Sequence, residues 1–72
     1  MNFTAQEKTF MELINSSLVC FNEKRKKKLT VDYYVDGGNV ARVSKNGNVL
    51  LSGISIEDAF YAVVGIIRFM EV

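Results

Sequence analysis

The middle of the chain, residues 29–52, constrains the fold most, because apolar and polar side chains alternate there and two glycine turns interrupt them. Asp36-Gly37-Gly38-Asn39 can supply the positive backbone angles of a tight turn, and Asn46-Gly47 is the most common short hairpin signal. The segments between the turns are rich in β-branched and aromatic residues, which predicts strands over about residues 29–35, 40–45 and 48–52. Such short turns join antiparallel strands, so the sequence predicts a three-stranded meander.

The predicted turns also assign each strand residue to one face of the sheet. If both turns are tight, Val35 pairs with Val40 and Val43 pairs with Leu50. The face that we expect to contact the core then carries Val31, Tyr33, Val35, Val40, Val49 and Leu51. The other face, which is too apolar for a simple solvent surface, carries Tyr34, Ala41, Val43 and Leu50. Arg42 falls on the core face, which indicates a bulged or slipped strand, an arginine that reaches the rim, or a polar site between protomers.

Helices are predicted on both sides of this meander. Thr4 and Glu7 form a capping-box pattern, which predicts a helix over residues 4–23 with an apolar stripe of Phe10, Leu13, Ile14, Ser17, Leu18 and Phe21. Ser55, followed by two acids, predicts the start of a second helix over residues 55–71. The stripe that should face the sheet contains Ile56, Ala59, Phe60, Val63, Ile67 and Met70. We therefore expect an α+β fold, a single two-layer domain over residues 1–72 in the order α-β-β-β-α.

The opposite side of the second predicted helix is also apolar, which is unusual for a surface helix. A helix that is apolar nearly all round is normally buried on more than one side, and a 72-residue chain has little surface with which to cover it. Association with another copy or another protein would bury this side. We expect a homo-oligomer, with a dimer favoured, and a protein interface formed by Tyr34, Val43, Leu50, Tyr61, Ala62, Gly65, Arg68 and Phe69.

A basic run holds five of the nine basic residues, Lys24, Arg25, Lys26, Lys27 and Lys28. Together with Arg42 and Lys45, these cations could contact the phosphates of a nucleic acid. They could also contact an acidic protein partner. The solvated end of the first helix, where cations complement the helix dipole, is by itself a sufficient explanation of the run. The net charge of +1 gives no overall attraction to nucleic acid, so the basic run leaves these alternatives open.

Composition argues against catalysis. The sequence contains no phosphate-binding glycine loop, no histidine and a single cysteine, Cys20, so it lacks the usual zinc ligand sets and the most common general base. We predict a non-enzymatic protein without metal or cofactor, and a buried, structural Cys20 beside the apolar stripe of the first helix. A small-molecule site between protomers, lined by tyrosine and arginine, is the remaining alternative.

The N-terminal residues lack the basic start and apolar run of a signal peptide, and the lone cysteine is typical of a reducing compartment. The uncharged run from Ala59 to Ile67 is far shorter than the ~20 residues that cross a membrane. We therefore expect a cytoplasmic protein without a membrane segment.

The predicted order of elements resembles the double-stranded RNA-binding domain. Members of that family carry lysines at the start of the second helix, where this chain has Ser55-Ile56-Glu57-Asp58-Ala59, and a Gly-Pro turn where it has Asp36-Gly37-Gly38-Asn39. The resemblance therefore implies topology alone. In its small size and its lack of proline and histidine, the chain is similar to small accessory proteins of bacterial viruses and prophages, many of which bind and inhibit a host factor. That resemblance implies a modulator of a host protein, acting in the host cytoplasm.

Overall fold

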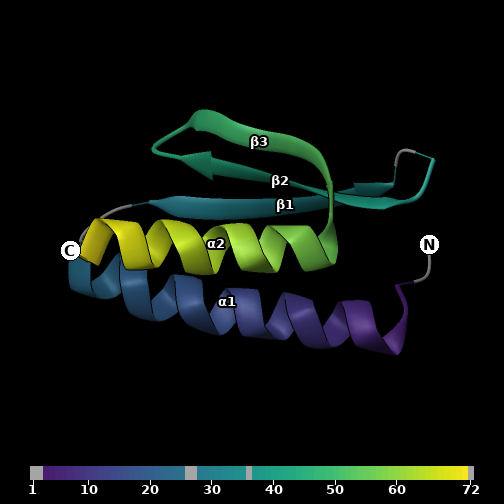
Figure 1. Ribbon diagram of the computed structural model, residues 1–72, viewed down its shortest axis with the longest axis horizontal. Helices are drawn as coiled ribbons and strands as arrows, with labels where there is room; N and C mark the ends of the chain where they lie inside the picture. The colour runs from purple at the N-terminus through teal and green to yellow at the C-terminus, as the bar shows by residue number, and fades with distance from the viewer. Residues whose placement is uncertain (1–2, 26–27, 36, 72) are drawn as a thin grey trace.

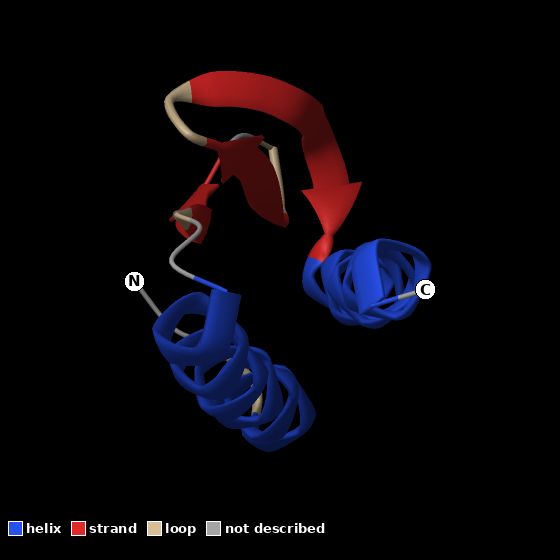
Figure 2. Ribbon diagram, turned by 90° about the vertical axis from the view of Figure 1, so that its left-hand side faces the viewer, coloured by secondary structure: helices blue, strands red, loops and turns tan. Residues whose placement is uncertain are grey.

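The computed structural model describes residues 3–25, 28–35 and 37–71. Residues 70 and 71 are described by their backbone alone. The elements are α1 (Ala5–Arg25), β1 (Leu29–Val35), β2 (Asn39–Lys45), β3 (Asn48–Ser55) and α2 (Ile56–Glu71). The strands form one antiparallel sheet in the order β1-β2-β3, and both helices lie on the same side of it (Figures 1 and 2). The predicted α+β fold with the order α-β-β-β-α is confirmed.

Both helices begin where their capping residues predict. At α1, the Glu7 amide donates to Thr4 Oγ1 at 3.0 Å and the Thr4 amide donates to Glu7 Oε1 at 2.8 Å, which completes the capping box. At α2, the Asp58 amide donates to Ser55 Oγ at 3.1 Å. Neither helix has, within its described residues, an apolar stretch long enough to cross a membrane.

The core lies between the two helices and the sheet. Its buried apolar side chains are Ile14, Leu18 and Phe21 of α1, Leu29 of β1, Ala41 and Val43 of β2, and Ile56, Ala59 and Val63 of α2. The predicted helical stripes are therefore largely confirmed. Leu13 is an exception, because it is 45% exposed, and the side chain of Met70 lies outside the described residues.

The first hairpin differs from the predicted register by one residue. Val35 pairs with Asn39, so the loop between the strands has three residues, with Gly37 in the left-handed conformation at φ 72°. Asp36 lies outside the described residues. A one-residue shift turns every side chain of a strand to the other face, so Ala41 and Val43 point into the core. The prediction of the core face was therefore wrong for β2. The prediction that Val43 lies on an outer surface was wrong for the same reason, because Val43 is buried in the core.

The second hairpin departs from a regular ladder through irregularities in β3. Lys45 pairs with Asn48 as predicted, but Val43 pairs with Leu51 rather than Leu50, and a further shift precedes the Ala41 pair. β3 consequently bends, and it arches from the hairpin tip down to the start of α2 (Figure 2). Ile54 of β3 packs against the core, but Val49, Leu50 and Leu51 remain open to solvent, exposed by 55%, 45% and 40%. The prediction that Val49 and Leu51 would be core residues was therefore wrong.

Candidate functional site

The side of α2 that points away from the core is apolar and exposed. Phe69 is 84% exposed, Tyr61 is 59% exposed, and Gly65 lies between them on the same face of the helix. A Cβ atom added to Gly65 would meet nothing within 4 Å, so the space above the helix is open at this point. The open apolar side that the sequence pattern indicates is therefore present in this fold.

One flank of this exposed side borders an apolar groove of about 520 Å³. The bend of β3 carries its first half away from the C-terminal half of α2 (Figure 1), and the groove lies between these two segments. We call it the β3–α2 groove; it is lined by Lys45, Leu50, Leu51, Ala62, Gly65, Ile66 and Phe69. The fold thus brings together four residues of the predicted interface, Leu50, Ala62, Gly65 and Phe69.

The other flank of α2 borders a second groove, of about 410 Å³, between α2 and α1. We call it the α1–α2 groove; it is lined by Ser16, Ser17, Cys20, Phe21, Lys24, Val64, Ile67 and Arg68. Cys20 is exposed here, so the prediction of a buried thiol was wrong. The cause is helical geometry, because Cys20 lies ~100° around α1 from the buried Phe21 and points into the open groove.

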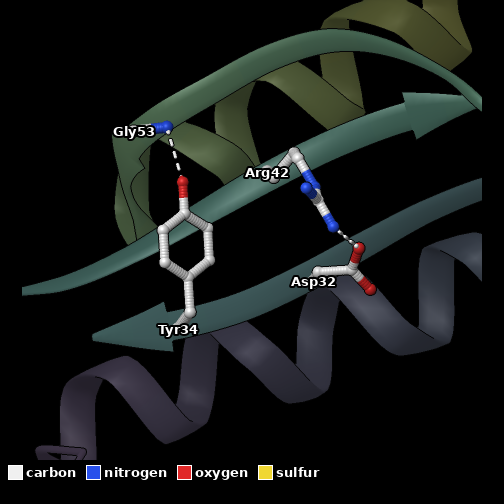
Figure 3. A network of polar contacts seen from close by, with 4 residues as sticks. All are labelled: Asp32, Tyr34, Arg42 and Gly53. Carbon is white, nitrogen blue, oxygen red and sulfur yellow. Dashed lines mark hydrogen bonds and ion pairs between the residues drawn. The ribbon is translucent and has the colours of Figure 1, made fainter. Parts of the chain in front are cut away.

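Two residues of the predicted site have partners on the outer face of the sheet (Figure 3). Arg42 Nη2 lies 2.9 Å from Asp32 Oδ2, directly across the β1–β2 ladder, because the shifted register turns Arg42 outward. Tyr34 accepts a hydrogen bond at 3.2 Å from the amide of Gly53, so its ring reaches from β1 over β2 to β3. Neither residue lines either groove.

The basic run connects α1 to β1. Lys24 and Arg25 lie in the last turn of α1, Lys28 is exposed just before β1, and Lys26 and Lys27 lie outside the described residues. The Lys28 amide donates to Asn46 Oδ1 at 3.2 Å and the Asn46 amide donates to the Lys28 carbonyl at 2.8 Å, so Lys28 is held against the β2–β3 turn.

More cations gather at this end of the molecule than the basic run alone provides. Both helices end there beside the start of β1 (Figure 1), which adds Arg68, and Lys45 lies opposite Leu29 in the sheet. We call this region the basic end; its described cations are Lys24, Arg25, Lys28, Lys45 and Arg68. Among the described residues none of these five forms an ion pair, in contrast to Arg42.

The perturbed titratable groups belong to the framework rather than to either groove. Hydrogen bonds from the Thr4 amide and from Asn39 Nδ2 lower the pKa of the Glu7 carboxyl, and the second bond, 2.8 Å long, ties α1 to β2. Burial raises the pKa of Tyr33 to about 12. Within the described part of the chain, no cluster of three or more histidine, cysteine or acidic side chains could hold a metal ion. The sequence pattern does not predict the Glu7–Asn39 bond, because no local signal marks a contact between residues so far apart in sequence.

Compared with known proteins, the chain matches no family model, no curated protein and no solved structure. Its function has to be inferred from the two grooves and the exposed side of α2.

Proposed function

We propose that this chain is a small binding protein without catalytic activity, which forms a symmetric dimer through the β3–α2 groove and acts by contacts with another protein. The observation that carries the proposal is the position of Phe69. It is 84% exposed and stands at the edge of an apolar groove on the same surface. A two-fold interface presents the same patch from both copies, so each Phe69 can enter the groove of the other protomer.

The exposed area suits a dimer of moderate affinity. The exposed parts of Phe69 and Tyr61 amount to roughly 200–350 Å², given that aromatic side chains bury about 150–250 Å² each. Val49, Leu50 and Leu51 add aliphatic surface beside them. A standard interface buries ~800 Å² per partner, which is about a sixth of the 4855 Å² that this chain exposes. Burial of the two Phe69 side chains would contribute ~3–6 kcal/mol, less than the ~8 kcal/mol of a micromolar dimer, so the aliphatic residues beside them must supply the rest.

The wider role that we propose is modulation of a partner protein in the cytoplasm, as in the small viral accessory proteins that the chain resembles. The exposed thiol of Cys20 supports a reducing compartment, because accessible free cysteines are rarely kept in oxidising ones.

The dimer is tested by charge substitution at its centre. Phe69→Glu should abolish self-association in sedimentation velocity, because it places a carboxylate in an apolar groove. Val19→Glu is the control, since Val19 is another exposed apolar residue, 59% exposed, but lies on α1, outside both grooves. Equal self-association of both variants would contradict the proposed interface.

Nucleic-acid binding is a second candidate, favoured by the five cations of the basic end, none of which forms an ion pair with another described residue. Binding led by phosphate contacts must strengthen as salt falls. Titration of labelled RNA and DNA at two salt concentrations tests it, and no binding at low salt would exclude it.

A further inference from the structure

The α1–α2 groove combines an apolar floor with a polar rim. Phe21, Val64 and Ile67 line it from both helices, and Phe21 is only 4% exposed. Ser16 and Cys20 are exposed along the α1 side. This arrangement differs from the β3–α2 groove, whose lining is apolar apart from Lys45.

Positive charge closes one end of the α1–α2 groove. Lys24 comes from α1 and Arg68 from α2, so the two cations stand on opposite sides at the same end. Neither forms an ion pair among the described residues, and Arg25 and Lys28 of the basic end add to the field. The exposed acid beside them, Glu23, does not line the groove. An occupant with negative charge next to apolar groups would therefore match this site.

The shape of the groove favours a helix over a small amphiphile. The α1 lining extends from Ser16 to Lys24, which corresponds to ~12 Å at 1.5 Å per residue, or just over two helical turns. The rim is open to solvent along this length, whereas small ligands are usually bound where 70–90% of their surface is buried. A helix needs only one buried stripe, and it can keep its other side in water.

We propose that the α1–α2 groove docks an acidic amphipathic helix of a partner protein, with its apolar stripe on Phe21, Val64 and Ile67 and its acids facing Lys24 and Arg68. This inference rests on the proposed role as a protein-binding module, but it uses the opposite flank of α2 from the dimer surface. Nucleic acid is the less favoured occupant, because phosphate contacts make no use of the apolar floor between the cations.

The test uses a fluorescent designed peptide with leucines spaced three and four residues apart and glutamates on both sides of that stripe. Two control peptides have the same length: one scrambles the order and removes the apolar stripe, and one replaces every glutamate with lysine. We expect the acidic amphipathic peptide to bind in an anisotropy titration, and both controls to bind about tenfold more weakly or not at all.

Charge reversal locates the electrostatic contact. Arg68→Glu and Lys24→Glu should each weaken peptide binding about fivefold or more. Lys8→Glu is the matched control, since it reverses one exposed cation on α1 outside the groove and should leave binding nearly unchanged. Circular dichroism checks that each variant is folded.

Cys20 gives an independent readout of the binding position, because it is the only cysteine of the chain and lines the groove. The saturating acidic peptide should slow the reaction of this thiol with an aromatic disulfide reagent several-fold, and the scrambled peptide should not.

Three results would overturn the inference: no binding of the acidic peptide, binding that leaves the Cys20 reaction rate unchanged, or binding that Arg68→Glu does not weaken. Labelled DNA or RNA that protects Cys20 where the peptide fails would assign the groove to nucleic acid instead. The dimer is measured separately by sedimentation, so a monomeric chain that still shows peptide protection of Cys20 would refute the dimer and retain the docking groove.

Discussion

Asn22 on α1 pairs with the backbone of Leu29 as though it were a residue of a neighbouring strand. Its Nδ2 donates to the Leu29 carbonyl at 2.9 Å, and its Oδ1 accepts from the Leu29 amide at 3.0 Å. Leu29 is the first residue of β1 and is 1% exposed, so this pair fixes where the sheet begins beneath the helix. The bonds hold the end of α1, with Lys24 and Arg25 in its last turn, against the start of β1, so the position of these two cations has a structural explanation that needs no ligand.

Replacement of this asparagine should destabilise the fold. Asn22→Ala leaves the part-buried amide and carbonyl of Leu29 without their partner, which costs ~2 kcal/mol in the free energy of unfolding. Urea denaturation followed by circular dichroism measures this change. Asn15→Ala, at an exposed position of the same helix, should change stability by less than about 0.5 kcal/mol. Equal losses in the two variants would show that the Asn22 pair contributes nothing specific.

Glu7 should make stability depend on pH in the acid range. Because the folded state lowers the pKa of this carboxyl from its usual 4.5, its contribution is fully present above pH 4.5 and is lost as pH falls through the lower folded-state pKa. The stability difference between the parent chain and Glu7→Gln should therefore shrink on acidification. Glu12→Gln, which removes an exposed acid of α1 away from the cap, controls for the loss of one charge. A difference that stays constant with pH would contradict the assignment.

The hydroxyl of Tyr33 is buried and has no hydrogen-bond partner among the described residues. Tyr33→Phe should therefore raise the free energy of unfolding by about 1 kcal/mol. The folded state raises the pKa of this phenol from 10.0 to about 12, so the parent chain should lose stability as pH rises from 10 towards 12, and the variant should lose less. Tyr61→Phe, on the exposed side of α2, is the control and should have little effect. A destabilised Tyr33→Phe variant would show that the hydroxyl is satisfied.

Gly65 and Gly53 should respond to alanine in opposite ways. Gly65 lies inside α2 with open space at its Cβ position, so Gly65→Ala should stabilise the monomer by ~1 kcal/mol through helix propensity. Measurement in the Phe69→Glu background separates this effect from the dimer. Gly53 has φ 67°, which is strained for alanine, so Gly53→Ala should destabilise by about 1 kcal/mol. Destabilisation by both substitutions would indicate that α2 does not tolerate a methyl group at position 65.

Local signals predicted the elements of this fold, and non-local geometry decided their faces. The capping residues Thr4 and Ser55 act within one turn of their own helix, so the helix starts could be predicted from sequence. The register of β2 depends on whether Asn39 belongs to the turn or to the strand, and both choices satisfy the same sequence pattern. Arg42 on the predicted core face was the available sign of the error, because the observed register places it beside Asp32 on the outer face.

The candidate site could be predicted only in part, because one of its features follows from a local sequence pattern and the others depend on non-local geometry. The apolar periodicity of α2 identified Tyr61, Gly65 and Phe69 as an uncovered surface. The β3–α2 groove beside them arises from the bend in β3, which no turn signal in the sequence predicts. The α1–α2 groove depends on how the two helices pack, so the periodicity of either helix alone could not predict it.

The proposed function depends on self-association of this chain through α2 and β3. Sedimentation equilibrium of the unmodified chain, from the low to the high micromolar range, measures this association. We expect a molar mass that rises with concentration from that of one chain, 8.1 kDa, towards that of two. A mass that stays at one chain throughout this range would contradict self-association.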